Sequence, residues 1–343
     1  MRAPVGLHLE YVSPAAYQAA RWGDVLGVAT FNGTRAPAGA AADVPVAQVS
    51  TPVLPASAHV YEVWRAGEPT EPGRHERVAF RRTADMLFGC IAVHEAGVRG
   101  AAHSALHEAT AQVYREICAT LDTQGCPHLL RVWNYVPDIN RDSDGTERYR
   151  QFNSARQQAL RASGRALAGN VPAASALGAA GASPLVVYFL AGRTAPIFVE
   201  NPRQVSAYHY PRQYGSHSPV FSRAALLRQR SSLTLFISGT ASIVGHRSLH
   251  VGDTAAQTRE TLANIEALLA EANRVACGAH FSLEALACKV YVRRPADLPI
   301  IQAELASAFG TDARIVYLQA DICRQDLLVE IEATAMCPLA ANP

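Results

Sequence analysis

The sequence predicts an α+β protein made of two similar halves, each a mixed β-sheet with helices packed on one face. Two amphipathic segments, 105–125 and 254–272, carry apolar residues at three- and four-residue spacing, which is typical of helices. Each lies between strand-like runs rich in β-branched and aromatic residues. The second set follows the first by about 150 residues, which indicates an internal repeat.

The composition describes a folded protein with two cores. A chain of 343 residues suits two domains of about 150 residues each. Hydrophobic residues make up 49% and charged residues 17% of the chain, as in folded proteins. The net charge of +2 lacks the basic excess of a nucleic-acid-binding protein. No apolar run approaches about 18 residues and no leader pattern begins the chain, so we expect no membrane partner and a cytoplasmic location.

The first half, 1–165, begins with a loop-rich extension. Stretches such as "TRAPAGAAADVP" are rich in Pro, Ala and Gly, and short strands such as 59–67 lie among them. A strand at 86–95 then leads into the helix at 105–125, and a second strand follows at 129–140.

The segment 166–184, "ALAGNVPAASALGAAGASP", is rich in small residues and shows little pattern. We interpret it as a linker or flexible loop. The second half, 185–343, then repeats the plan and is expected to carry most of the active site. Its predicted elements, in order, are a strand at 233–245, the helix at 254–272, and strands at 287–298, 313–323 and 327–333.

No cofactor or metal is expected. The seven cysteines form no C-x-x-C pair, which fits neither a disulfide framework nor a thiolate zinc site. His103 and His107 lie four residues apart but not in an H-E-x-x-H motif, so we interpret them as ordinary histidines. No Gly-rich dinucleotide motif or phosphate-binding loop is present.

Two acidic residues interrupt the last apolar strand, "LLVEIEA". Glu330 and Glu332 are two residues apart and therefore point to the same face of a strand. Burial raises the pKa of a carboxyl group because desolvation disfavours its charged form, so a buried Glu can serve as a general acid at neutral pH. Periodicity does not separate the two residues, and a salt-bridged Glu without chemistry remains an alternative.

Tyrosine and arginine gather in two segments. "ERYRQFNSARQ" contains Tyr149 and Arg156, and "SAYHYPRQYGSHS" contains Tyr208, Arg212 and Tyr214. The Arg fork binds a carboxylate through two parallel hydrogen bonds, and hydroxyl groups add further donors. The two clusters predict a binding site for a small anionic ring compound; a polar surface coat is the alternative.

Several segments resemble a known family. "SGTASIVG", "AAQTRETLANIEALL" and "ARIVYLQADICRQDLLVEIEA" resemble the RidA (YjgF-like, chorismate-mutase-like) fold. The two-half length and the intervening "NPRQVSAYHYPRQYGSHSPVFSRA" resemble the chorismatases, enzymes that remove pyruvate from chorismate. The resemblance covers most of the chain from about residue 86 onward. It implies chorismate as the small-molecule partner and a monomer that imitates part of a RidA trimer.

The resemblance also assigns residues. In the RidA-like fold the first Glu of the terminal strand faces the ligand cleft, which selects Glu330 over Glu332 as the acid. Arg314 matches the carboxylate-gripping arginine within one position, although it could instead cap the preceding helix. Gly239 and Thr240 would form the cleft wall, where Gly permits close approach of a ligand.

Two further residues bear on the product. Cys323 lies seven residues before Glu330, like the cysteine of the chorismatases that form 3-hydroxybenzoate. Ala241, in place of Gly, resembles the hydrolytic type. The combination resembles the bifunctional group that makes both 3- and 4-hydroxybenzoate. A small buried hydrophobe is the alternative role for Cys323.

The expected function is therefore chorismate cleavage to pyruvate and 3-hydroxybenzoate, 4-hydroxybenzoate or both, by protonation of the enol methylene carbon. Three alternatives stay open: hydrolysis to 3,4-dihydroxycyclohexa-1,5-diene carboxylate and pyruvate, a RidA-like imine deaminase, and a ligand-binding protein on the same fold.

Overall fold

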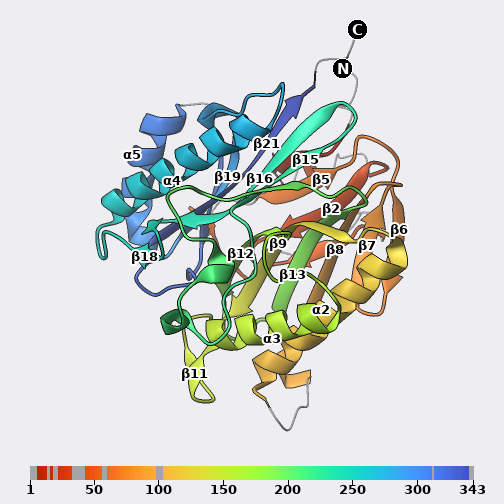
Figure 1. Ribbon diagram of the computed structural model, residues 1–343, viewed down its shortest axis with the longest axis horizontal. Coiled ribbons are helices and arrows are strands. Elements are labelled where there is room, and N and C mark those ends of the chain that lie inside the picture. Colours follow the sequence, from red (N-terminus) through yellow and green to blue (C-terminus); the bar gives the residue numbers. More distant parts are fainter. Residues whose placement is uncertain are drawn as a thin grey trace.

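The computed structural model describes residues 6–13, 16–17, 22–32, 43–55, 60–97, 103–310 and 313–339. Most of the expected stretch "TRAPAGAAADVP" lies outside these ranges. Three sheets carry the fold, and two of them are covered on one face by helices (Figure 1). The predicted α+β class is confirmed. None of the helices within these ranges is long and apolar enough to cross a membrane.

The first large sheet has six strands and is covered by helices α2 and α3. In spatial order its strands are β12 (Ala173–Ala179), β9 (His128–Pro137), β13 (Leu185–Gly192), β8 (Met86–Val93), β7 (Val78–Arg82) and β6 (Glu71–His75). Helix α2 (Ala105–Gln124) begins at the N-cap Ser104 and ends at Gly125, whose φ of 64° is the left-handed conformation that glycine favours. Helix α3 (Arg148–Ala162) follows a short hairpin, β10 (Asp142–Ser143) and β11 (Thr146–Glu147).

The second large sheet has seven strands and is covered by helices α4 and α5. In spatial order its strands are β14 (Ile197–Val199), β15 (Ala224–Arg228), β16 (Ser232–Ala241), β21 (Val329–Pro338), β19 (Ala287–Val292), β20 (Arg314–Gln319) and β4 (Val53–Leu54). Helix α4 (Thr254–Val275) starts where the Asp253 side chain accepts a hydrogen bond from the Ala256 amide. Helix α5 is Leu298–Phe309, and a hairpin, β17 (Ile243–Val244) and β18 (Arg247–Ser248), follows β16.

The two large sheets share one topology. The order β8, β13, β9, β12 in the first corresponds to β16, β21, β19, β20 in the second. In both, the last two strands run parallel and the other pairs run antiparallel. The repeat expected from the sequence is therefore present in the structure.

The structure differs from the prediction between the halves. The small-residue segment 166–184 contains strand β12, which is largely buried, and β13 completes the first sheet rather than beginning the second. Small residues are needed there because β12 lies against the second half: the Ala174 amide donates to Ser238 Oγ of β16 at 2.8 Å, and a Cβ at Gly178 would meet Asp321 at 2.6 Å. The division into an N-terminal domain, 1–165, and a C-terminal domain, 185–343, stays a prediction.

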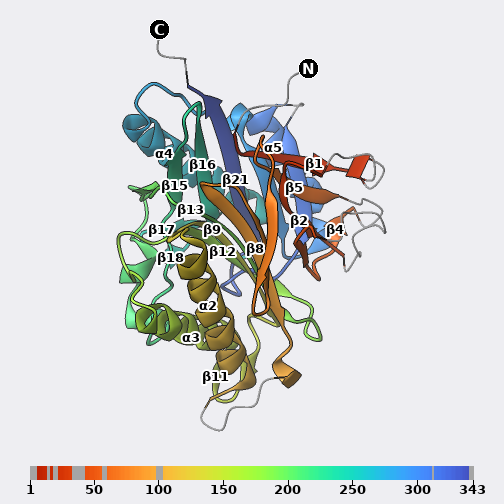
Figure 2. The ribbon, with the colours of Figure 1, turned by 90° about the vertical axis from the view of Figure 1, so that its right-hand side faces the viewer.

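A third, smaller sheet closes the centre of the molecule. Its strands, in spatial order, are β1 (His8–Val12), β5 (Tyr61–Arg65), β2 (Val25–Thr30) and β3 (Val46–Gln48). Figure 2 shows these strands on the side of the molecule opposite to α2 and α3. The central hydrophobic core joins side chains of all three sheets, including Trp64, Trp133 and Phe236. Two outer cores lie under α2 and α3 and under α4 and α5.

Candidate active site

A cavity of about 760 Å³ opens where the two large sheets meet. Its wall combines the β10–β11 hairpin and α3 of the first half with β16, β21 and the 323–326 loop of the second. The segment 200–223, which connects β14 to β15, adds Tyr210 and Tyr214. A concave site of this size between structural units suits a small-molecule ligand.

Buried amides of α4 hold the second-half wall of this cavity in place. Asn264 Nδ2 donates to the carbonyl oxygens of Ala241 and Ile243, at 3.0 and 2.9 Å. Gln257 accepts from the Leu328 amide and donates to the Asp326 carbonyl, both at 2.8 Å. These bonds fix the end of β16 and the entry to β21, and so the position of Glu330.

Glu330 lies on β21 with its side chain toward the first half and only 4% exposed. The neighbouring Val329 and Ile331 face the opposite way, into the core under α4 and α5. Burial, followed by the charge of Glu332, raises the pKa of Glu330 to about 8, against the lowering effect of Arg131, Arg223 and Arg293. The carboxyl group is therefore largely protonated at neutral pH.

Gly239 on β16 makes room for this carboxyl group. A Cβ at position 239 would lie 1.9 Å from Glu330 Oε1 and 2.7 Å from its Cδ, which no side chain could occupy without displacing the acid. The Gly239 amide donates to Ser175 Oγ of β12 at 3.0 Å. The close approach of β12, β16 and β21 thus shapes the floor of the cavity.

Glu332 shares the face of Glu330 but lies in a closed ion network. Its carboxylate contacts Lys289 Nζ and Arg131 Nη2, both at 2.7 Å, and accepts hydrogen bonds from Trp133 Nε1 and Ser175 Oγ, both at 2.6 Å. Burial opposes its ionisation, but Lys289 and Arg131 hold the pKa of Glu332 below its ordinary value. This residue is a fixed charge, with no lone pair left for a proton transfer.

Two arginines and two tyrosines form the polar wall. Arg223 Nη2 donates to Tyr210 Oη at 2.7 Å, and the Arg324 guanidinium carbon lies 4.0 Å from the centre of the Tyr214 ring. Arg223 Nε and Arg324 Nη2 have no hydrogen-bond partner among the described residues. Because buried guanidinium nitrogens need acceptors, these two atoms mark a place for an anionic ligand.

A narrow extension of the cavity lies beyond Glu330, between Tyr149, Arg156 and Cys323. Burial raises the pKa of Cys323 to about 12, so its thiol is protonated and a poor nucleophile. Burial likewise raises the pKa of Tyr149 well above its ordinary value, so that its hydroxyl group remains a donor.

The structure brings most of the candidate residues together. Those that line this cavity or its extension are Tyr149, Arg156, Tyr214, Gly239, Ala241, Cys323 and Glu330. Arg223 and Arg324 were not selected from the sequence. Both lie within the segments that suggested the family, but no spacing indicates that their side chains meet across the junction of the sheets.

Arg314 is a correction. It lies exposed at the start of β20, where Nη2 donates to the Ala285 carbonyl at 2.8 Å, and it lines a different cavity with Leu9 and Tyr11. The carboxylate-binding role expected for Arg314 does not fit this position. Arg314 lies outside the cavity because β19 separates β20 from β21, the strand that carries Glu330.

Three more candidates lie beside the cavity rather than in its wall. Arg212 lines a neighbouring cavity. Tyr208 packs against the core under α2 and α3. Thr240 is 2% exposed and its Oγ1 donates to the Ser238 carbonyl at 2.9 Å, next to a register shift in β16 that follows Ile237. None of the three lines the cavity that holds Glu330.

One group that could hold a metal ion lies among the described residues, at His103, His107 and Glu108. None of these three residues lines the cavity around Glu330. The cavity itself offers a protonated acid, guanidinium groups and hydroxyl donors, a set suited to acid catalysis on an anionic substrate.

The two repeated sheets meet at this cavity, which is the candidate active site. A family model described as "Chorismatase FkbO/Hyg5-like, N-terminal" matches residues 62–191. The chain belongs to the chorismatase family. It is 38% identical over 293 residues to a 3-hydroxybenzoate synthase of Streptomyces hygroscopicus, covering 83% of this chain and 84% of that protein.

Two further relatives agree with this assignment. A chorismatase of Streptomyces rapamycinicus is 40% identical over 281 residues, which cover 79% of this chain and 80% of the relative. A solved chorismatase structure superposes with a TM-score of 0.87 at 32% identity, covering 96% of this chain and 98% of that one. The resemblance expected from the sequence is confirmed.

Proposed function

We propose that this enzyme cleaves chorismate, releasing pyruvate and a hydroxybenzoate. The observation that carries the proposal is the protonated Glu330 carboxyl in a cavity that also presents unpartnered guanidinium nitrogens of Arg223 and Arg324. The names of the relatives support chorismate as the substrate.

The cavity suits the chemistry of this substrate. Chorismate carries two carboxylates, a ring hydroxyl group and an enol ether. Arg223 and Arg324 supply the charged donors for a carboxylate, because guanidinium nitrogens bind such groups through short charge-assisted hydrogen bonds. Tyr149, Tyr210 and Tyr214 supply hydroxyl groups and aromatic surface for the ring.

The reaction begins with proton transfer from Glu330 to the methylene carbon of the enol ether. This produces an oxocarbenium ion, which either water or the neighbouring ring hydroxyl group captures. Capture by the ring hydroxyl group closes a cyclic ketal and releases the hydroxyl proton. Pyruvate then leaves when one ring C–O bond and the ketal C–O bond to the other ring oxygen break, so that one oxygen stays on the ring. Capture by water instead gives a hemiketal, which breaks down to pyruvate and the ring diol. A hydroxybenzoate and pyruvate together contain all the atoms of chorismate, so aromatisation requires the ring to return a proton; Glu330, which is then a carboxylate, would accept it. The dihydrodiol route instead consumes one water.

For the product, we propose 3-hydroxybenzoate, with 4-hydroxybenzoate as a second product. Cys323 and Ala241 line the cavity, and one relative is named for 3-hydroxybenzoate. Because its thiol is protonated, Cys323 would act as a weak donor or acceptor beside the ring rather than as a thiolate nucleophile.

The decisive experiment is pyruvate release from chorismate, coupled to chromatographic identification of the aromatic product. The dihydrodiol alone would refute hydroxybenzoate formation. Chorismate binding without pyruvate would favour a ligand-binding protein, and ammonia release from 2-aminoacrylate would favour a deaminase. The monomeric state and the cytoplasmic location stay predictions; light scattering of the purified protein tests the first.

A further inference from the structure

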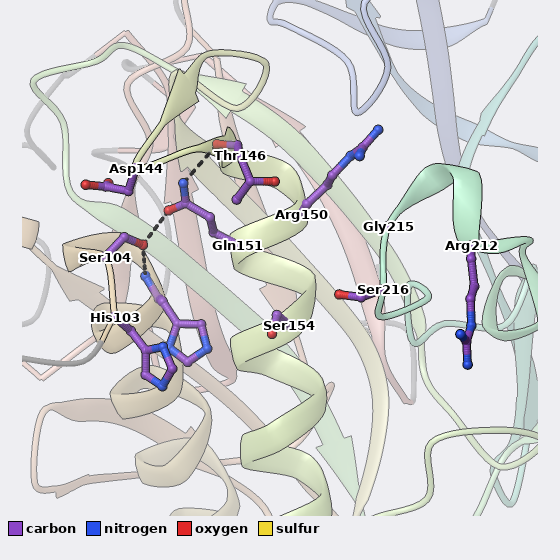
Figure 3. Close-up of a pocket in the computed structure, with 11 residues that line it drawn as sticks. His103, Ser104, Asp144, Thr146, Arg150, Gln151, Ser154, Arg212, Gly215 and Ser216 are labelled. Atoms are coloured by element: carbon purple, nitrogen blue, oxygen red, sulfur yellow. Dashed lines mark hydrogen bonds between the residues drawn. The ribbon is translucent and has the colours of Figure 1, made fainter.

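Figure 3 shows the residues that line a second cavity, of about 650 Å³. It is formed by the start of α2, one side of α3, the β10–β11 hairpin and the segment 200–223. It shares Thr146 and Arg150 with the substrate cavity, so the two are neighbours. Nothing in the proposed reaction uses it.

His107 is the unusual residue of this cavity. Its side chain is buried, with 8% of the residue exposed, yet neither Nδ1 nor Nε2 has a hydrogen-bond partner within the described part of the chain. A buried polar group without a partner is costly, so two such nitrogens on one ring indicate a missing ligand. The imidazole of His103 lies beside it, with the ring centres 4.1 Å apart.

A third ligand-type side chain completes the group. Glu108 follows His107 directly, and the ligand atoms of His103, His107 and Glu108 all lie within 4.8 Å of one another. Ligands at about 2.0 to 2.2 Å from a tetrahedral zinc ion are roughly 3.3 Å apart, so a modest rotation of side chains would close the site. His103 is exposed and Glu108 partly so, which leaves both able to rotate around the fixed His107.

The charged side chains around the two histidines do not oppose a cation. Arg150 and Arg212 also line the cavity, but both point away from His103 (Figure 3). The carboxylate of Glu108 offsets the positive end of α2.

We propose that His103, His107 and Glu108 bind one divalent transition-metal ion of the zinc class, with water completing the coordination. Two imidazoles and a single carboxylate suit Zn²⁺ or Co²⁺, whereas Mg²⁺ and Ca²⁺ require more oxygen ligands. The site holds the metal through the first turn of α2.

Hydrogen bonds connect the proposed metal site to the wall of the substrate cavity. Ser104, between the two histidines, donates to Gln151 of α3, and Gln151 Nε2 donates to the carbonyl oxygens of Ser143 at 2.6 Å and Thr146 at 3.0 Å. These bonds connect the start of α2 to the β10–β11 hairpin, which also lines the substrate cavity. Metal binding would therefore stabilise the rim of the substrate site.

Titration calorimetry of the metal-free, untagged full chain with ZnCl₂ tests the proposal. We expect one ion per chain, no binding of MgCl₂, and an affinity that falls at least about tenfold in the double variant His103→Ala, His107→Ala. The control variants are His250→Gln, a half-exposed histidine that contacts Glu260 elsewhere, and Cys277→Ser, an exposed thiol; both should bind zinc as the unaltered chain does.

Other outcomes would overturn the site. Equal zinc affinity in the double variant, or no binding at all, would refute it. With Co²⁺ we expect visible absorption without a thiolate charge-transfer band, and such a band would place the ion on cysteine instead. Phosphate binding in the absence of zinc would show an anion site at the start of α2. If the double variant does not fold by circular dichroism, the exposed His103→Ala variant alone gives the comparison. If zinc does not bind, the proposed function still stands, because no step of the reaction uses this cavity.

Discussion

Glu330 and Glu332 lie two residues apart on one face of β21, yet the pKa of one carboxyl group is raised and that of the other is lowered. The difference comes from their neighbours. Lys289 and Arg131 hold the charge of Glu332, and this fixed charge, after burial, raises the pKa of Glu330. The structural carboxylate therefore helps to keep the proposed catalytic acid protonated.

Replacing Glu330 with Gln removes the proton donor while keeping the shape of the side chain. We expect kcat for pyruvate release to fall by about 10²-fold to 10⁴-fold, the contribution of a positioned general acid. Chorismate binding, measured by calorimetry, should change little. Glu284→Gln, on an exposed glutamate at the surface, is the control. Full activity in the Glu330 variant would exclude the acid role.

The pH dependence of kcat follows from the same group. The acid must be protonated, and the pKa of Glu330 is raised to about 8. We expect kcat to be level below about pH 7 and to decline about tenfold per pH unit well above 8, since only the protonated fraction is active. The carboxylates of chorismate are already ionised at these pH values. A rate that rises with pH between 7 and 9 would contradict protonation by Glu330.

The protonated acid also affects stability. A carboxyl group whose pKa is higher in the folded protein contributes stability that is complete below its unfolded pKa and is lost as the pH rises through its folded pKa. For Glu330 this loss falls between about pH 4.5 and 8 and amounts to roughly 5 kcal/mol. Glu330→Gln cannot ionise, so it avoids this loss. In urea unfolding, the stability of the variant relative to the unaltered protein should therefore be greater at pH 9 than at pH 5. An equal difference at both pH values would argue against the raised pKa.

Gly239→Ala tests the fit between β16 and the acid. The added methyl group would overlap the Glu330 carboxyl, and we expect kcat to fall about 10²-fold through misplacement of the acid. The backbone at Gly239 is not in the left-handed region, so the chain should still fold. Gly23→Ala, where no atom lies within 4 Å of the new Cβ, is the matched control and should keep normal kinetics.

Arg324 lines the cavity around Glu330, whereas Arg314, which the sequence predicts to bind a carboxylate, does not. Arg324→Lys replaces the planar fork beside Tyr214 by a point charge, and we expect KM for chorismate to rise about tenfold or more. Arg314→Ala should leave KM unchanged, because Arg314 lies outside this cavity. Steady-state kinetics of both variants measure the two KM values. A larger rise in KM for Arg314→Ala than for Arg324→Lys would show that Arg314, and not Arg324, binds the substrate.

Sequence periodicity predicts well the helices and strands that bury one face against a single core. Helices α2 and α4 each bury one stripe, and β21 alternates between an apolar face and the face of Glu330. Strand β12 was interpreted as a linker because its Ala and Gly residues meet another strand closely rather than filling a core.

The site was predictable only in part, for a geometric reason. Residues on the terminal strand and on α3 could be selected by face and by family resemblance. Arg223 and Arg324 meet at the cavity because the two sheets pack together there. That packing depends on strand pairing between residues far apart in the sequence, which periodicity does not reveal. The family resemblance predicts Thr240 in the cleft wall, but the register shift in β16, which the sequence does not reveal, lies next to this residue.

The ion network around Lys289 limits how this chain can be divided. Its members come from three different sheets: Glu62 from β5, Arg131 from β9, and Lys289 and Glu332 from β19 and β21. A fragment with one sheet would bury charges without their partners, which destabilises a protein by about 3 to 5 kcal/mol for each broken pair. Although the two repeated units look like separable modules, the charges at the centre are balanced only when strands of all three sheets are present together.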